Sequence, residues 1–225
     1  MSKFNVSNAE IVEKIAEGQF GPIFVVKDKK DIYCMKSFVK KRLDEYEVED
    51  FINNEANILS SISHPLINPL VATLHTSSMA FYITNFVEGV ELYNVMEEIG
   101  ILSSQDAKFY AANILAILEY LHSELIISRD IKPENFMVSH TGSLILTNLS
   151  VAKKVKKEHR EWGRTYTIIG TPHYMAPDII LGRGYNNMVD LWSLGIIIYE
   201  FMCGYLPYGD HAEGAYEIYE DIMQN

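Results

Sequence analysis

Residues 128–135 read SRDIKPEN, and this stretch decides how the whole chain is interpreted. An aspartate, Asp130, is followed two residues later by Lys132 and five residues later by Asn135. The spacing suits phosphoryl transfer, in which a carboxylate orients a hydroxyl, a lysine neutralises charge and an amide oxygen holds magnesium. The alternative is a polar turn between a helix and a hairpin. The residue types and their spacing favour a catalytic segment.

The composition is that of a folded protein. Of the 225 residues 48% are hydrophobic and 12% aromatic, which argues against intrinsic disorder. The net charge of −11 argues against nucleic acid or an anionic membrane as a partner. Cys34 and Cys203 are too few for a disulfide framework, and the first residues carry no secretory signal, so we expect a cytoplasmic protein. The apolar stretch at 191–206 is too short and too often interrupted to span a membrane, and predicts a buried helix.

The first part of the chain reads as strands with one helix. Residues 20–39 alternate β-branched and aromatic runs around the turn signal KDKKD, which predicts a hairpin. Residues 45–63 carry apolar side chains at helical spacing and predict a helix that ends before a proline. Two more strands are predicted at 70–74 and 81–86.

The later part reads as mostly helical. Ser103-x-x-Asp106 resembles a capping box and predicts the start of a long helix. Residues 136–138 and 144–146 predict a small hairpin. Residues 153–167 are polar and basic without periodicity, which predicts a long loop.

A second motif names a family. Residues 164–178 read RTYTIIGTPHYMAPD, and together with SRDIKPEN they resemble the eukaryotic protein kinases, in particular the cyclic-nucleotide-dependent kinases of the AGC group. The likeness covers about residues 10–225. It implies an α+β, bilobal protein-kinase-like fold, with a small antiparallel β-sheet lobe over 1–86 and a helical lobe over 87–225.

The resemblance also implies an ATP site, with magnesium as the metal. Residues 15–23, IAEGQFGPI, resemble the glycine-rich loop that covers the phosphates, although Ala16 stands where the first glycine is expected. An ordinary hairpin turn is the alternative for this loop. The implied nucleotide-binding residues are Ile15, Ala16, Gly18, Gly21, Ile23, Lys36, Glu55, Val87, Glu91 and Met137.

Within that set the resemblance assigns individual roles. Lys36 pairs the ATP phosphates with Glu55, and Val87 offers backbone groups to adenine. Glu91 approaches the ribose or an arginine of the substrate. The alternatives are a surface lysine and glutamate at the first pair, and a helix-starting acid at Glu91.

The resemblance extends to protein substrates and activation. The implied substrate-binding residues are Glu91, Glu134, Glu200 and Thr171, of which the three glutamates would hold basic residues beside a target Ser/Thr. His173 stands where the group commonly has another acid. Thr167 matches an activating phosphorylation site, and its phosphate would pair with Arg129. The alternative is an unmodified, exposed threonine.

Asn148-Leu149-Ser150 replaces the family's Asp-Phe-Gly. In the family that aspartate is the principal magnesium ligand, so Asn148 and Asn135 are the predicted metal ligands here. An asparagine keeps one oxygen but has no negative charge, and magnesium prefers anionic oxygen ligands. We expect weakened activity, by roughly 10²–10³ in rate for the loss of one electrostatic stabiliser.

A second departure concerns an apolar stack that links the lobes in the family. Its matching positions are Leu59, Leu70, Leu149 and Ser128, anchored by Asp190. Ser128 replaces a large His or Tyr, so we expect the stack to be loosened at its base.

Three functions follow from these observations. The first is a Ser/Thr kinase of reduced activity, and the second is a pseudokinase that binds nucleotide and acts as a scaffold. The third is an inactive fragment, since the chain stops at Asn225 where the family continues, so that the helical lobe is truncated. No cyclic-nucleotide-binding domain is recognisable, so regulation would come from a separate regulatory chain or from sequence that is missing here. Most charge runs are solvated loops, and an anion site is the alternative for Lys153, Lys154, Lys156, Lys157, Arg160 and Arg164.

Overall fold

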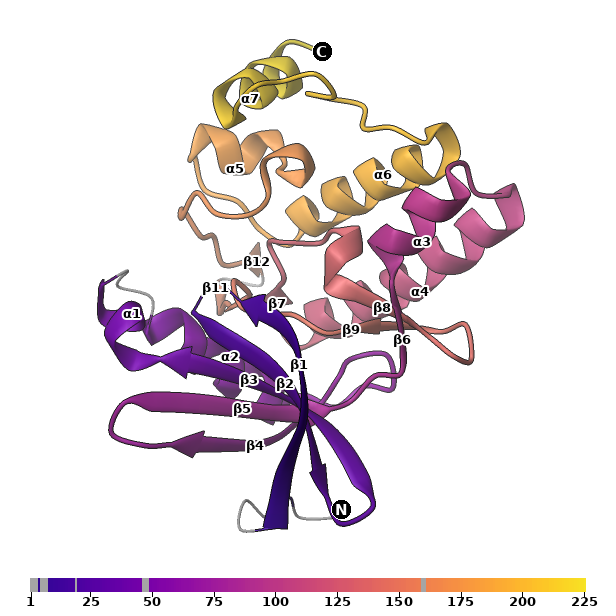
Figure 1. Cartoon of the computed structure of the whole chain (residues 1–225). Coiled ribbons are helices and arrows are strands. Elements are labelled where there is room, and N and C mark those ends of the chain that lie inside the picture. The colour runs from indigo at the N-terminus through magenta and orange to yellow at the C-terminus, as the bar shows by residue number, and fades with distance from the viewer. Residues whose placement is uncertain (1–3, 5–7, 19, 46–48, 159–160) are drawn as a thin grey trace. The chain divides into compact units, whose positions relative to one another are not determined.

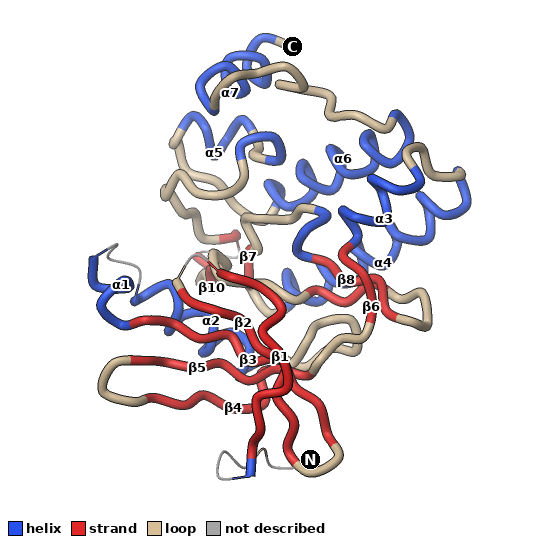
Figure 2. Tube along the Cα trace, in the orientation of Figure 1, coloured by secondary structure: helices blue, strands red, loops and turns tan. Residues whose placement is uncertain are grey.

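The structure is a computed structural model that describes residues 4, 8–18, 20–45, 49–158 and 161–225. The chain divides into two compact units, Met1–Glu88 and Gly89–Asn225, whose elements are drawn in Figure 1 and coloured by type in Figure 2. The division that we predict after residue 86 remains a proposal about domains, because compactness alone does not show independent folding.

The first unit is built on one five-stranded antiparallel sheet with the order β1-β2-β3-β5-β4. Its strands are β1 (Ala9–Gly18), β2 (Gly21–Asp28), β3 (Asp31–Val39), β4 (Leu70–His75) and β5 (Met79–Asn85). The hairpin predicted over 20–39 is β2 and β3, joined at Asp28 and Asp31. The strand β1 has no counterpart among our predicted elements, because it is a polar edge strand whose apolar Ile11 and Val12 are exposed.

Two helices accompany this sheet, α1 (Lys40–Glu45) and α2 (Glu49–Ser61). The single helix predicted over 45–63 is therefore too long at both ends, and part of the prediction falls on residues 46–48, outside the described residues. Ile52 of α2 packs in one cluster with Phe38 and Tyr82 of the sheet. The Tyr82 hydroxyl donates a 2.6 Å hydrogen bond to the carbonyl of Ile52, which fixes α2 against the sheet.

The second unit is mostly helical. Its helices are α3 (Leu92–Ile99), α4 (Ser104–Ser123), α5 (Pro177–Leu181), α6 (Met188–Cys203) and α7 (Ala215–Gln224), with short 3-10 helices η2 (Pro133–Asn135) and η3 (Pro172–Tyr174). Its strands are β6 (Gly89–Glu91), β7 (Ile126–Ile127), β8 (Phe136–Ser139), β9 (Leu144–Leu146), β10 (Lys153–Lys154), β11 (Lys157–Glu158) and β12 (Glu161–Trp162). The predicted hairpin at 136–146 is β8 and β9.

The two longest helices of this unit form its centre. Ser103 caps α4, because its hydroxyl accepts a 3.1 Å hydrogen bond from the Asp106 N–H and donates one of 2.6 Å to the Asp106 carboxylate. Helix α6 packs against α4, and Ile197 and Phe201 on it have no exposed surface. The helix predicted at 191–206 is thus a central one. Among the described residues, no helix is both long and apolar enough to cross a membrane.

The basic segment at 153–167 differs from the loop that we predict. It contains three two-residue strands, of which β10 pairs with β7 and β11 with β12. The sequence of these strands shows no hydrophobic alternation. For example, β10 consists of two exposed lysines, which pair with Ile126 and Ile127 of β7. Pairing with a buried strand distant in the sequence therefore overrides the local pattern.

Candidate active site

The backbone of the 128–135 segment is held by one carboxylate. Asp190, in the first turn of α6, is completely buried. Its Oδ2 accepts a hydrogen bond of 2.9 Å from the Ser128 N–H, and its Oδ1 accepts one of 2.8 Å from the Arg129 N–H. The His122 ring lies 2.8 Å from the same Oδ2. The anchoring role predicted for Asp190 is what the structure shows.

Arg129 adopts an unusual backbone conformation that turns the segment. Its φ of 67° is in the left-handed region, and its Nε donates a 2.6 Å hydrogen bond to the Val151 carbonyl. Gly170 passes close by, where a Cβ would stand 2.7 Å from the Arg129 carbonyl oxygen. Only glycine allows this approach, so the 128–135 segment and the segment before Thr171 are locked together.

The other two predicted catalytic residues, Lys132 and Asn135, lie close to the Asp130 carboxylate. Thr171 donates a 2.6 Å hydrogen bond to Asp130 Oδ1, and Asn135 Nδ2 lies 3.1 Å from Oδ2. Lys132 Nζ lies 3.6 Å from the same Oδ2 and donates a 2.8 Å hydrogen bond to Thr171 Oγ1. Thr171, which the resemblance assigns to substrate binding, therefore belongs to the same cluster.

The predicted metal ligands contact each other. Asn148 Nδ2 donates a 3.1 Å hydrogen bond to Asn135 Oδ1, and Asn148 Oδ1 accepts one of 3.1 Å from the Ser150 N–H. Asn135 itself is buried, and its carbonyl oxygen accepts from the backbone N–H of Thr147 at 2.9 Å. The segment after β9 is thus joined to η2 by side chain and backbone.

Two acidic residues of the predicted substrate site, Glu134 and Glu200, lie near Tyr174. The Tyr174 hydroxyl donates a 2.8 Å hydrogen bond to Glu200 Oε2. Burial raises the pKa of the Glu200 carboxyl, the hydrogen bond from Tyr174 opposes this rise, and the nearby charges of Glu134 and Glu97 add to it. Burial, followed by the charge of Glu200, also raises the pKa of Tyr174.

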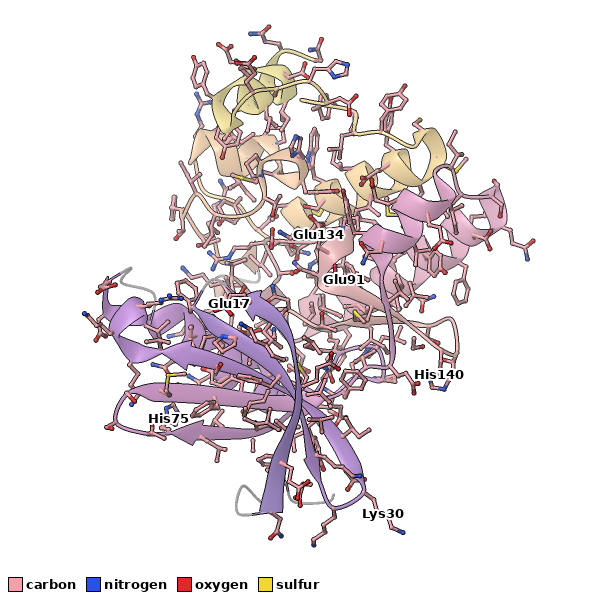
Figure 3. The ribbon with its side chains drawn as sticks, in the orientation of Figure 1. Glu17, Lys30, His75, Glu91, Glu134 and His140 are labelled. Carbon is pink, nitrogen blue, oxygen red and sulfur yellow. The ribbon has the colours of Figure 1, made fainter. Side chains whose placement is uncertain are left out.

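Two further acidic residues lie on elements that contact each other, Glu91 on β6 and Glu97 on α3. Glu91 is exposed on β6, paired in register with Met137, and β6 contacts η2, which carries Glu134; both glutamates are labelled in Figure 3. Glu97 on α3 is absent from the predicted set. Nothing in its local sequence distinguishes it from the adjacent Glu98, since its role follows from where α3 lies in the fold.

The predicted nucleotide residues divide between the two units. In the first, Lys36 lies on β3 with Ile23 and Tyr82 as its register neighbours. Glu55 is buried on α2, and burial together with the charge of Glu55 raises the pKa of Tyr82. Lys36 and Glu55 thus share a neighbour in Tyr82, and their pairing stays a prediction.

The glycine-rich loop is described except for Gln19, which lies outside the described residues. Gly21 is required at its position, because a Cβ there would stand 2.5 Å from the Ser37 carbonyl oxygen. The Ser37 hydroxyl also hydrogen-bonds to the Pro22 carbonyl. Ile15 and Ala16 are exposed on β1, and Val87 follows β5. Gly18 ends β1, and the nucleotide-binding role of all these residues stays a prediction.

Thr167 is exposed, as a modification site requires. Its carbonyl accepts a 2.6 Å hydrogen bond from the Tyr185 hydroxyl, which fixes its backbone and leaves the side chain accessible. Phosphorylation of Thr167 and pairing of its phosphate with Arg129 stay predictions. Ser128 and Leu149 are both buried, so these positions of the predicted stack lie within the protein interior.

Comparison with known proteins decides the family. The model of the protein kinase domain matches residues 9–225 of this chain. The chain belongs to the protein kinase family. This confirms the resemblance that the motifs suggest. It also confirms the α+β kinase fold, whose antiparallel sheet of five strands and set of helices are present.

Relatives of this kinase domain include cGMP-dependent and cAMP-dependent protein kinases. A cGMP-dependent protein kinase of Plasmodium berghei (strain Anka) is 40% identical over 211 residues, which cover 93% of this chain and 24% of that protein. The cGMP-dependent protein kinase of Eimeria tenella is 37% identical over 224 residues, covering 99% and 22%. The cAMP-dependent protein kinase catalytic subunit 3 of Drosophila melanogaster is 37% identical over 223 residues, covering 98% and 37%. The chain spans about a quarter of the length of the cGMP-dependent relatives.

Membership of the kinase family implies ATP and a divalent metal as cofactors. The side chains at the predicted metal position do not fit a divalent cation. Asn148 contributes no charge, and it directs an N–H donor instead of an oxygen at Asn135 Oδ1, so the two side chains do not present paired oxygens to a cation. Within the described ranges, no three His, Cys, Asp or Glu side chains are close enough to hold a metal ion.

Proposed function

We propose that this chain is a serine/threonine protein kinase domain in which Asp130 receives the hydroxyl of a protein substrate. The supporting observation is the arrangement around its carboxylate. Thr171 and Asn135 each donate to one oxygen, and Lys132 lies 3.6 Å from the second oxygen. A carboxylate oxygen can accept more than one hydrogen bond, so both oxygens of Asp130 can still accept one from a substrate hydroxyl.

The proposed step balances in protons and bonds. The substrate oxygen bonds to the γ-phosphorus of ATP, the bond from that phosphorus to the ADP oxygen breaks, and the hydroxyl proton passes to Asp130. Lys132 places its positive charge beside the group that transfers. Thr171 holds the Asp130 carboxylate in one orientation, because its hydroxyl donates to Asp130 and accepts from Lys132.

The acidic group around Tyr174 supports a preference for basic peptides. Glu200 accepts only one hydrogen bond among the contacts of the described residues, from Tyr174, while Glu134 and Glu97 raise its pKa. A guanidinium group would neutralise this mutual repulsion and form bidentate contacts with a carboxylate. We therefore propose substrates with an arginine near the target Ser/Thr.

The test is transfer of labelled phosphate to an arginine-containing serine peptide, with magnesium and then with manganese. Asp130→Asn should lower the rate at least about 100-fold, because it removes the proton acceptor. Asp44→Asn on α1 is the matched control, since it makes the same exchange at an exposed position. Folded protein that transfers no phosphate, even with the substitution Asn148→Asp, would refute the enzyme.

A second candidate, a nucleotide-binding pseudokinase, is favoured by one observation. Asn148 offers an amide where the family has a carboxylate, and it bonds to Asn135. On this proposal ATP raises the melting temperature equally in magnesium and in EDTA. No shift in either solution would exclude it, and a shift that needs magnesium would favour the enzyme. A cytoplasmic location and a regulatory chain remain expectations from the sequence.

A further inference from the structure

The hydrogen bonds that run from Ser150 to Asp130 have only one possible direction. At one end the backbone N–H of Ser150 can only donate, and it donates to Asn148 Oδ1 at 3.1 Å. The other group of the Asn148 amide, Nδ2, therefore faces Asn135 and donates to its Oδ1 at 3.1 Å. The orientation of the Asn148 amide follows from this backbone donor.

The other end of the chain of hydrogen bonds fixes Asn135 independently. Its Nδ2 faces the carbonyl oxygen of Asp130 at 2.7 Å and the Asp130 carboxylate at 3.1 Å, and both of these groups only accept. Asn135 must therefore direct Nδ2 toward Asp130 and Oδ1 toward Asn148. Both ends give the same assignment, so each amide has a single consistent orientation.

We propose that the Asn148 amide replaces a divalent cation in this domain. Its positively polarised N–H lies against Asn135 Oδ1, the oxygen that the family pattern assigns to a metal, and so joins the segment after β9 to the catalytic segment without metal. The inference goes beyond the proposed activity, because it concerns cation binding and stability and holds whether or not phosphate is transferred.

An aspartate could not make the same contact. The substitution Asn148→Asp keeps an oxygen for the Ser150 N–H, but it directs a second oxygen at Asn135 Oδ1 with no hydrogen between them. Two acceptors about 3.1 Å apart repel, and a cation between them would relieve the repulsion. The exchange of one N–H₂ for one oxygen should therefore convert a metal-independent contact into a metal-dependent one.

The variant should still fold, because side-chain and backbone contacts share the connection. The Asn135 carbonyl accepts from the Thr147 N–H at 2.9 Å and from the Thr147 hydroxyl at 3.2 Å, and neither bond involves Asn148. Asn113→Asp is the matched control. It also replaces an amide that donates to a carbonyl oxygen, that of Phe109 at 2.8 Å, but this hydrogen bond on α4 is exposed to solvent.

The experiment measures melting temperature and Mn²⁺ binding in the full chain without nucleotide or substrate. In EDTA, Asn148→Asp should melt about 4 °C below the wild type, for the loss of a half-buried hydrogen bond in a chain of this size. Mn²⁺ should restore this loss, and paramagnetic resonance should show about one equivalent of Mn²⁺ bound to Asn148→Asp. The wild type and Asn113→Asp should bind none at the same concentration and show no Mn²⁺-dependent shift.

A measurement on the wild type alone guards against a variant that fails to fold. With ¹⁵N-asparagine labelling, the side-chain amide of Asn148 should exchange its hydrogens slowly and remain unchanged when Mn²⁺ is added. Broadening of that signal by Mn²⁺ in the wild type would overturn the proposal. The proposal would also be overturned if Asn148→Asp had the melting temperature of the wild type in EDTA, or if Mn²⁺ did not raise the melting temperature of Asn148→Asp.

Discussion

Asp190 and Glu200 lie on the same helix, α6, and their carboxylates are treated in opposite ways. Asp190 has no exposed surface and accepts hydrogen bonds from the N–H groups of Ser128 and Arg129, with His122 against it. Glu200 is half-buried, with the Tyr174 hydroxyl as the donor shown and other acids nearby.

We propose that the difference separates a carboxylate that holds the protein's own backbone from one that binds a substrate. A buried charge is stabilised when its own chain supplies the donors, as at Asp190. Where the chain supplies one hydroxyl and adds like charges, the carboxylate gains most from a cation brought by another molecule. On this reasoning, Asp190 holds the catalytic segment and Glu200 is available to a basic peptide.

The strongest test of this contrast is Asp190→Asn. An amide has only one acceptor oxygen, so at least one of the N–H groups of Ser128 and Arg129 would face an NH₂ group. We expect the free energy of unfolding to fall by about 3 kcal/mol in urea titrations. Asp178→Asn, at an exposed position on α5, should change it little. Equal losses in the two variants would remove the distinction.

The opposite result is expected for peptide binding at Glu200. Glu200→Gln should lower the affinity for an arginine-containing peptide about tenfold to thirtyfold, measured by fluorescence anisotropy, since the guanidinium loses its charged partner. Glu98→Gln is the control, because Glu98 is exposed and follows Glu97 on α3. We expect almost no change in its peptide affinity. Unchanged affinity in Glu200→Gln would show that the acidic group does not bind the peptide.

A smaller effect is expected in the pH dependence of stability. Because the folded pKa of Glu200 is raised, the folded state binds this proton more tightly than the unfolded state. Its contribution is present below the unfolded pKa of about 4.3 and is lost as pH rises through the raised folded pKa. The stability of the wild type minus that of Glu200→Gln should therefore fall across this window. A flat or rising difference in urea titrations would contradict this sign.

The smallest effect concerns the Tyr174 hydroxyl. Its hydrogen bond lowers the pKa of Glu200 against the effect of burial, so Tyr174→Phe should raise that pKa further. The titration of the ¹³C-labelled Glu200 carboxyl by NMR measures this directly. We expect a stability change of only about 0.5–1 kcal/mol, because the ring remains in place. A lowered pKa in Tyr174→Phe would mean that another donor takes over.

Local signals in the sequence predicted those parts of the fold that depend on neighbours along the chain. The cap at Ser103 and the hairpin of β2 and β3 are examples, since turn residues and short-range spacing determine both. The strand β1 and the short strands β10 to β12 were missed. β1 and β11 each pair with the next strand along the chain, but their residues are polar or few; only β10 takes a distant partner, β7.

The candidate site divides in the same way. The spacing within residues 128–135 predicted that Asp130, Lys132 and Asn135 act together. The structure places all three in one cluster with Thr171. Glu97 was not predicted, because an acid on a helix surface carries no local sign that the half-buried carboxylate of Glu200 lies near it. The Asn148–Asn135 hydrogen bond was also not predicted from the sequence. The sequence shows that position 148 lacks a negative charge, but not that its amide donates to Asn135.

By itself the sequence determined the family, the long helix before the catalytic segment, the buried helix after it and the absence of a carboxylate at position 148, because these depend on residue identity and spacing. Only the tertiary structure decided what each polar group does. Asp190 accepts from N–H groups 62 and 61 residues earlier in the chain, while Glu200 receives one hydroxyl and two acidic neighbours. Hydrogen bonds act over about 3 Å, so donors so distant along the chain are assigned only when the chain has folded.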